Sequence, residues 1–208
     1  MTHDASIAGN IEDPRTLSLA REFLSRGAVV VLPTDTLYGF SAPLSAEATI
    51  RRISAIKHAT NDRRYILLAA SIDMVDRYVQ SYGCVTREVL ASRWPAPLSV
   101  ILPSGAACPP WVGPTVAVRV PALEPLRRLI EAVGEPIVST SVNRAGADPL
   151  DDAHDIRREF SAEVDLIVTG EVPGLASSTL VDLCGKTPKV IREGAYAWAA
   201  AGAGKPSK

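Results

Sequence analysis

The chain is poor in cysteine and in aromatic residues. Its three cysteines, Cys84, Cys108 and Cys184, lie far apart among 208 residues, and no two form a Cys-x-x-Cys pair. This pattern argues against a disulfide framework and against a zinc site, so we expect three reduced thiols. Aromatic residues make up 5% of the chain, which argues against an RNA-binding module that works by stacking bases.

Long hydrophobic runs and an excess of charge of one sign are also missing. No apolar run is long enough to span a membrane, and the first four residues lack the basic start of a secretion signal. We therefore expect a cytosolic protein without a membrane partner. The net charge of −1 argues against strong electrostatic binding of nucleic acid, so any affinity for RNA should be weak and depend on a local patch.

The common catalytic patterns are absent as well. The sequence contains no Walker glycine-rich loop and no dinucleotide-binding fingerprint, and its three histidines, His3, His58 and His154, are scattered. No nucleophile stands beside an evident acid–base partner. These absences give no support to covalent catalysis.

What is present fits one α/β domain. Hydrophobic residues make up 47% of the chain and charged residues 22%, and no linker-like stretch divides it. Helical and strand signals alternate, which favours a layered α/β arrangement, and the short spacings near the C-terminus indicate a mixed sheet. We expect the domain at 8–196, followed by a flexible tail of small residues at 197–208.

Apolar periodicity locates the expected elements. Helices are expected at about 13–27, 45–56, 72–80, 86–93, 123–133 and 151–160, and strands at 28–32, 65–70, 98–102, 115–120, 136–140, 166–169, 179–183 and 189–192. Asp13 and Ser45 are the expected N-caps of the first two helices. The strand at 115–120 alternates polar with apolar residues, as a half-exposed strand does.

Two apolar strands end in short hydrogen-bonding side chains. Val29–Leu32 runs into Pro-Thr-Asp-Thr at 33–36, and Pro136–Val138 runs into Ser-Thr-Ser-Val-Asn at 139–143. Ligand sites of α/β proteins lie at such strand ends, so we expect a small polar ligand here. On residues alone, the second segment is also typical of an ordinary turn.

Basic residues form two further candidate groups. Between Arg51 and Arg64 there are five basic residues and one acidic residue, a cluster suited either to a triphosphate or to a solvated helix face. Arg119, flanked by two valines, points away from them by strand alternation and faces either solvent or a polar groove.

These segments, taken in order, resemble the TsaC/YrdC superfamily, whose best-known members make threonylcarbamoyl-AMP. Trp94–Pro97, Val118–Pro121 and Val190–Gly194 extend the resemblance, which runs from about Val29 to Gly194. It implies a single-domain YrdC-like fold, in which a twisted, mixed open sheet with flanking helices forms a concave ligand groove.

The resemblance also implies an activity. It is that of a threonylcarbamoyl-AMP synthase, a nucleotidyltransferase that makes L-threonylcarbamoyladenylate and pyrophosphate from L-threonine, bicarbonate or CO₂, and ATP with Mg²⁺. The product serves the tRNA modification N6-threonylcarbamoyladenosine (t6A), completed downstream by t6A-transfer proteins. Such chemistry needs positioning and charge neutralisation more than a covalent enzyme intermediate.

Individual residues take their implied roles from the same resemblance. Lys57, Ser141 and Asn143 are the expected catalytic residues. Thr34, Thr36 and Tyr38 are expected around threonine and its carbamate, and Arg119 on the threonine carboxylate. Thr179, in Ser177-Ser178-Thr179, is a further candidate for substrate binding. The expected nucleotide-binding residues are Lys57, Arg63, Ser139, Ser141, Asn143 and Arg192, and no metal site made by the protein itself is expected.

The chain departs from the family pattern at one position. Lys57 matches the lysine of a Lys-x-Arg signature, but Ala59 stands where the arginine belongs. The segments Glu163–Ile167 and Val190–Gly194 resemble the YciO branch at least as closely as they resemble the synthases, and the missing arginine points the same way. A member of that branch would bind nucleotide with weak or different activity. A YciO-type paralogue is therefore the first alternative, and a non-catalytic RNA-binding module is the second.

Overall fold

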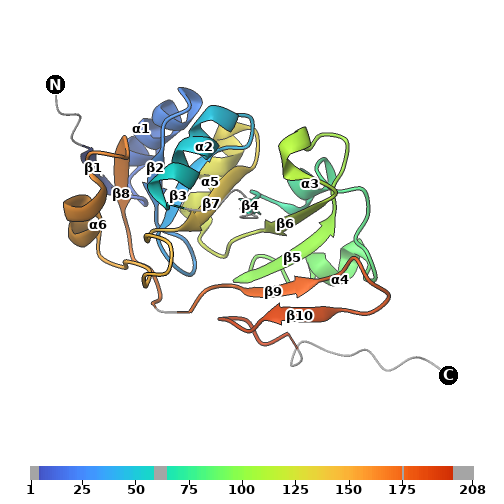
Figure 1. Ribbon diagram of the computed structural model, residues 1–208. Coiled ribbons are helices and arrows are strands. Elements are labelled where there is room, and N and C mark those ends of the chain that lie inside the picture. Colours follow the sequence, from blue (N-terminus) through green and yellow to red (C-terminus); the bar gives the residue numbers. More distant parts are fainter. Residues whose placement is uncertain (1–4, 59–64, 175, 199–208) are drawn as a thin grey trace.

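A twisted sheet runs through the whole molecule (Figure 1). The computed structural model describes residues 5–58, 65–174 and 176–198. Within them the ten strands are β1 (Ser6–Asn10), β2 (Val30–Leu32), β3 (Gly39–Pro43), β4 (Ile66–Leu68), β5 (Leu98–Pro103), β6 (Thr115–Arg119), β7 (Ile137–Ser141), β8 (Leu166–Thr169), β9 (Thr179–Asp182) and β10 (Lys189–Arg192). Their order across the sheet is β1-β8-β2-β3-β7-β4-β6-β5-β9-β10.

The sheet is mixed, as the sequence predicts. Parallel pairs are β1 with β8, β2 with β8, β4 with β6, and β5 with β9. The remaining neighbours, such as β3 with β7 and β5 with β6, are antiparallel. The predicted α/β class and open, twisted sheet are therefore confirmed.

Helices flank this sheet (Figure 1). The α-helices of the described residues are α1 (Pro14–Ser25), α2 (Glu47–Ile56), α3 (Ile72–Asp76), α4 (Arg87–Ala91), α5 (Glu124–Val133) and α6 (Ala153–Phe160), and a 3₁₀ turn, η1, spans Pro110–Val112. Helix α1 packs on α5 and on the strands β1, β8, β2 and β3, while α6 packs on β8. The edge of the Phe160 ring meets Phe40, with 5.1 Å between ring centroids, which ties α6 to β3.

Capping explains where several helices begin and end. The Asp13 side chain accepts the Arg15 N–H at 2.8 Å, so the predicted N-cap of α1 is confirmed. The predicted N-cap Ser45 is wrong, because α2 begins after Ala46, and Ser45 instead gives its N–H and hydroxyl to the Glu135 carboxylate.

Two strands and one exposure pattern differ from the sequence prediction. The polar strand β1 and the Gly- and Pro-containing strand β3 were not expected, because their residues read as loop. The predicted half-exposed strand at 115–120 is wrong: residues 116–119 of β6 are all buried. Strand β6 lies inside the sheet between β4 and β5, and its second face lines a pocket.

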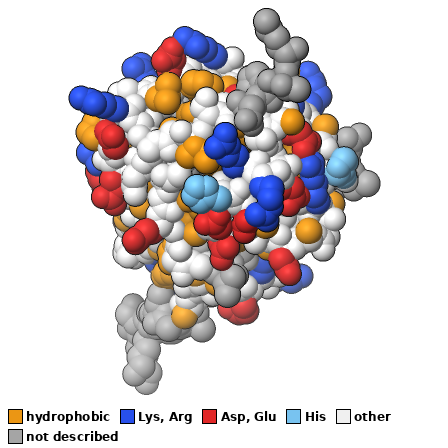
Figure 2. Space-filling model, turned by 90° about the vertical axis from the view of Figure 1, so that its left-hand side faces the viewer, with side chains coloured by type: hydrophobic (Ala, Val, Ile, Leu, Met, Phe, Trp, Pro, Cys, Tyr) orange, Lys and Arg blue, Asp and Glu red, His pale blue; other side chains and the backbone are white. Residues whose placement is uncertain are grey.

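Charges are mixed on the face beside β1 and α6. Figure 2 shows acidic and basic side chains interspersed there, and within α6 Arg158 pairs with Asp155. No helix among residues 5–58, 65–174 and 176–198 is both long and apolar enough to cross a membrane.

The predicted tail begins inside the described residues. Trp198 packs against the core, and the Arg93 guanidinium lies 4.3 Å from the centre of its ring. Residues 199–208 lie outside the described residues, so the tail boundary at 197 stays a prediction.

Candidate active site

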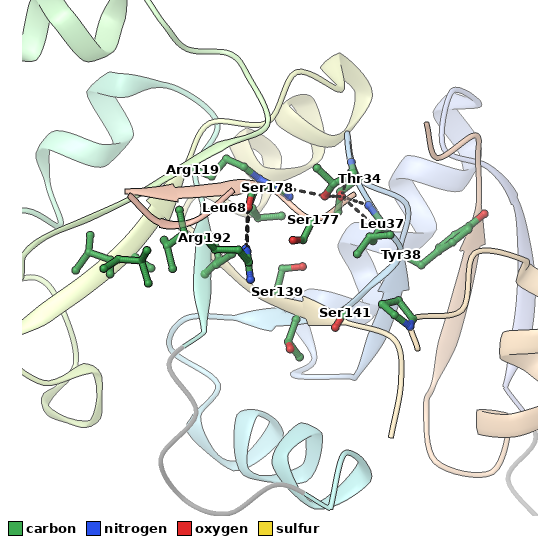
Figure 3. A pocket seen from close by; sticks show the side chains of 18 of the residues that line it. Thr34, Leu37, Tyr38, Leu68, Arg119, Ser139, Ser141, Ser177, Ser178 and Arg192 are labelled. Atoms are coloured by element: carbon green, nitrogen blue, oxygen red, sulfur yellow. Dashed lines mark hydrogen bonds between the residues drawn. The ribbon is translucent and has the colours of Figure 1, made fainter. Parts of the chain in front are cut away.

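A pocket of about 470 Å³ opens on one face of the central strands (Figure 3). Its walls come from the turn after β2, from the loop segments at 149 and 177–178, and from six strands. The lining residues are Thr34, Thr36, Leu37, Tyr38, Ile66, Leu68, Ile101, Thr115, Ala117, Arg119, Ser139, Thr140, Ser141, Pro149, Ser177, Ser178, Leu180, Ile191 and Arg192.

Strand alternation decides which residues of β6 face this pocket. Thr115, Ala117 and Arg119 are alternate residues and all line it, whereas Val116 and Val118 belong to the hydrophobic core. Arg119 therefore faces a polar groove, one of the two orientations that the sequence left open.

Ser139 and Ser141 reach the pocket from β7 in the same way. Gly39 on β3 lies opposite Ser141 in the register. A Cβ on Gly39 would lie 2.3 Å from Ser139 Oγ, so a side chain at this position would displace the Ser139 hydroxyl. The second polar strand end predicted from the sequence is thus part of the pocket wall.

The turn after β2 is held by the buried hydroxyl of Thr34. This hydroxyl donates to the Leu37 carbonyl at 2.7 Å and accepts the backbone N–H groups of Thr36 and Leu37. Its oxygen also lies 3.0 Å from Thr36 Oγ1. Thr34 shapes the turn and has no proton left for a ligand.

Arg119 reaches toward this turn (Figure 3). Its NH1 donates to Thr36 Oγ1 at 3.0 Å, and its NH2 lies 3.4 Å from Asp35 Oδ1. The side chain is only 4% exposed, yet its Nε–H has no hydrogen-bond partner among the described residues. Burial lowers the pKa of Arg119, Asp35 raises it, and Arg192 lowers it further. A buried guanidinium that lines a pocket is suited to an anionic ligand.

Arg192 stands at the opposite end of the chain but in the same pocket. Its Nε and NH2 donate to the Ser178 carbonyl at 3.1 and 2.9 Å, and NH2 also contacts Ser178 Oγ at 3.3 Å. Ser178 Oγ in turn meets Ser99 Oγ at 2.8 Å. Burial lowers the pKa of Arg192. The contacts with Ser178 therefore fix a second guanidinium at the pocket.

The two arginines set the charge of the pocket. Among the described residues its lining holds Arg119 and Arg192 and no carboxylate. Hydroxyl groups and apolar strand residues make up most of the remainder. Such a site favours a ligand with separate anionic groups and an apolar portion.

Lys57 lies behind the pocket wall. Its ammonium donates to the Ser141 carbonyl, to the Asn143 carbonyl at 3.0 Å and to Asn143 Oδ1 at 2.6 Å. Asn143 Oδ1 also accepts the Ser141 hydroxyl at 2.7 Å, and Asn143 Nδ2 donates to the Arg144 and Ala147 carbonyls. Lys57 is fully buried, and neither it nor Asn143 lines the pocket. In this structure the two side chains hold the end of β7, while Ser141 alone of the three faces the pocket.

Other predicted site residues are placed as follows. Tyr38 lines the pocket, but its hydroxyl points away from Ser139 (Figure 3). That hydroxyl donates to the Gly170 carbonyl at 2.7 Å. Thr179 is buried, and its hydroxyl donates to the Tyr196 carbonyl at 2.6 Å, so it secures the start of β9. Arg63 and Ala59 lie outside the described residues.

Sequence reasoning missed part of the site. Ser178 lines the pocket one residue from the chosen Thr179. Asp35, which was read only as part of a polar turn, does not line the pocket but lies beside Arg119. The apolar wall residues carried no signal, because a strand residue facing a pocket looks like one facing the core; they are Ile66, Leu68, Ile101, Leu180 and Ile191.

The donor groups bear on how Mg²⁺ could be held. No group of three or more metal-binding side chains of the types His, Cys, Asp and Glu occurs in the described part of the chain. The hydroxyls of Ser139 and Ser141 are oxygen donors of the kind that Mg²⁺ accepts, but they are too few for a cage. These two hydroxyls suit contact with a magnesium ion that is carried by nucleotide phosphates.

The chain is similar in sequence to known proteins. The family model Sua5_yciO_yrdC, described as telomere recombination, matches residues 22–194. The curated threonylcarbamoyl-AMP synthase of Nitrosococcus oceani is 33% identical over 155 residues, covering 73% of this chain and 84% of that protein.

Two solved structures are also similar to this chain. P. abyssi Sua5 complexed with L-threonine has a TM-score of 0.84 and 30% identity, over 91% of this chain and 58% of that one. E. coli YciO also has a TM-score of 0.84, with 26% identity over 92% of this chain and 96% of its own. This chain thus spans somewhat more than half of the Sua5 protein and nearly all of YciO. The predicted resemblance is confirmed: the chain belongs to the Sua5/YciO/YrdC family.

Proposed function

We propose that the chain is a threonylcarbamoyl-AMP synthase, an enzyme of the nucleotidyltransferase type. One observation carries the proposal within this family: two guanidinium groups, Arg119 and Arg192, converge on one hydroxyl-lined pocket that has no carboxylate in its described lining. The substrates are L-threonine, bicarbonate or CO₂, and ATP. The curated relatives are named for this activity.

The proposed division of the pocket follows its charges. Arg119, which lines the pocket, binds the threonine carboxylate. Arg192, held by Ser178, binds nucleotide phosphate, and Ser139 and Ser141 contact phosphate oxygens or magnesium-bound water from β7. Mg²⁺ arrives with ATP and neutralises phosphate charge.

The reaction proceeds by positioning. The threonine nitrogen attacks the carbon of CO₂ or bicarbonate, and a carbamate forms with loss of a proton or of water. A carbamate oxygen then attacks the α-phosphorus of ATP, the Pα–O–Pβ bond breaks, and pyrophosphate leaves. The two arginines hold the reacting groups in place and offset their negative charge as they approach each other. The adenylate formed would then be used by t6A-transfer proteins.

The test is a reaction with ATP, Mg²⁺, L-threonine and labelled bicarbonate. Pyrophosphate should form only when threonine and bicarbonate are both present, and the label should appear in threonylcarbamoyl-AMP. Equal ATP turnover without threonine would refute the synthase proposal.

A YciO-type paralogue is the second candidate. Ala59 in place of the signature arginine favours it, as does the match to E. coli YciO over nearly the whole length of both chains. Ala59→Arg should raise synthase activity if the chain is a weakened synthase. If ATP binds but Ala59→Arg stays inactive, the paralogue assignment is the better one.

RNA binding by this chain stays a prediction of weak affinity. Measured RNA binding should collapse as salt rises, because only local patches of the chain are basic. Tight, salt-resistant and sequence-specific binding would favour the module instead.

A further inference from the structure

We propose that Asp35 is a positioning residue for substrate recognition: its buried carboxylate holds the Arg119 guanidinium in the orientation that binds the substrate carboxylate. The inference rests on the proposed function. Asp35 acts through Arg119, the residue that contacts the substrate. Asp35 itself does not line the pocket.

The geometry gives Asp35 two attachments. Its Oδ2 accepts the Ala122 backbone N–H at 2.8 Å, which anchors the carboxylate to the loop that follows β6. Its Oδ1 lies 3.4 Å from Arg119 NH2, and both side chains are about 95% buried, with 5% and 4% exposed. Asp35 thus links the loop after β6 to the guanidinium at the end of β6.

Arg119 is held on two sides as a result. Thr36 accepts from NH1 at 3.0 Å, and Asp35 stands beside NH2. The guanidinium is planar, so two attachments at different nitrogens fix its plane as well as its position. Arg119 lines the pocket, so its guanidinium is then presented there in a fixed orientation.

The pair is left incompletely hydrogen-bonded. Asp35 Oδ1 and Arg119 Nε are both buried atoms without a hydrogen-bond partner among the described residues. Buried polar groups are normally satisfied, and an ion pair that served stability alone would gain from closing these bonds. Arg119 lines the pocket, and a guanidinium held in place there is suited to a ligand carboxylate.

The negative charge of Asp35 has a second role because Arg192 lies in the same pocket. It lines the same pocket and acts electrostatically on Arg119. Two like charges facing one pocket repel, so without Asp35 the Arg119 guanidinium would turn away from its position. Substrate binding would then have to restore that position.

The experiment measures recognition of the carboxylate itself. Calorimetry compares L-threonine with L-threoninol, in which the carboxylate is replaced by an alcohol, for the full chain and for Asp35→Asn. The asparagine keeps the shape and can still accept the Ala122 N–H, but it loses the charge. We expect the preference for threonine over threoninol to fall by about tenfold to a hundredfold, with ATP affinity unchanged.

Asp165 offers a matched control. Its Oδ2 accepts the Val29 N–H at 2.7 Å and its carboxylate pairs with Arg52, also at 2.7 Å, but it does not line the pocket. Asp165→Asn removes the same charge from a similar setting and should leave the threonine preference unchanged.

The outcomes separate this inference from the proposed function. Failure of the unmodified chain to bind threonine, with ATP binding intact, overturns both. An unchanged preference in Asp35→Asn overturns the role of Asp35 alone. A stronger preference would mean that Asp35 competes with the substrate carboxylate, which also overturns it. If Asp35→Asn does not fold, Asp35→Glu decides: its displaced charge should reduce the preference, and wild-type preference would refute the proposal.

Discussion

Replacing Arg119 with lysine tests the proposed binding of the threonine carboxylate at its end of the pocket. Lysine keeps the positive charge but has a single nitrogen in place of a planar fork, so it cannot keep the Thr36 contact and still offer a fixed N–H to the substrate. The side chain is 4% exposed, so solvent does little to weaken the bonds that are lost. One charge-assisted hydrogen bond is worth about 1.5–3 kcal/mol, which corresponds to a rise in the threonine KM of about tenfold to a hundredfold.

The assay is steady-state pyrophosphate release with threonine varied at saturating ATP and bicarbonate. The KM for ATP should change by less than about twofold, since Arg192 and Ser178 are untouched. Arg192→Lys is the matched control and should raise the KM for ATP more than that for threonine. An unchanged threonine KM in Arg119→Lys, or equal rises for both substrates, would refute the assignment.

Three further predictions concern stability. Lys57→Met should lower the free energy of unfolding in urea by about 3 kcal/mol, because three acceptors lose a buried ammonium; weaker ATP binding at unchanged stability would instead support direct phosphate contact. Tyr38→Phe should lower the free energy of unfolding by about 1–2 kcal/mol, because the hydrogen bonds to Gly170 are lost, and it should have little effect on the threonine KM. The hydrogen bond from Arg144 lowers the pKa of Glu163, so its stabilising contribution is complete above about pH 4.3, the ordinary value for glutamate, and is lost as the pH falls through the lower folded value. Glu163→Gln should flatten that part of the stability-against-pH curve, and an unchanged curve would contradict the pairing.

The sequence predicts the elements whose pattern is local. Asp13 and Pro14 mark the start of α1, and Gly134 in the left-handed conformation ends α5 as expected. The strand at 166–169 is confirmed with the same bounds. Each of these signals depends only on residues within one turn or strand.

The errors arise where distant segments decide the outcome. Ser45 bonds to Glu135, 90 residues away in sequence, instead of capping α2. Strand β6 is buried because it lies between β4 and β5, with one face in the core and the other lining the pocket. For the site, the sequence predicts which strand ends are polar. It cannot predict that Lys57 and Asn143 satisfy each other while Ser178 and Asp35 stand beside the pocket's arginines.

The pocket draws on the beginning, the middle and the end of the chain, and this has a consequence during synthesis. Thr34 emerges from the ribosome early, Ser139 much later, and Arg192 only when β10 follows β9 onto the edge of β5. A nascent chain that stops before β9 therefore leaves β5 as an open sheet edge and lacks one of the two guanidiniums. The pocket is therefore completed only when the last strands have joined the sheet and closed that edge.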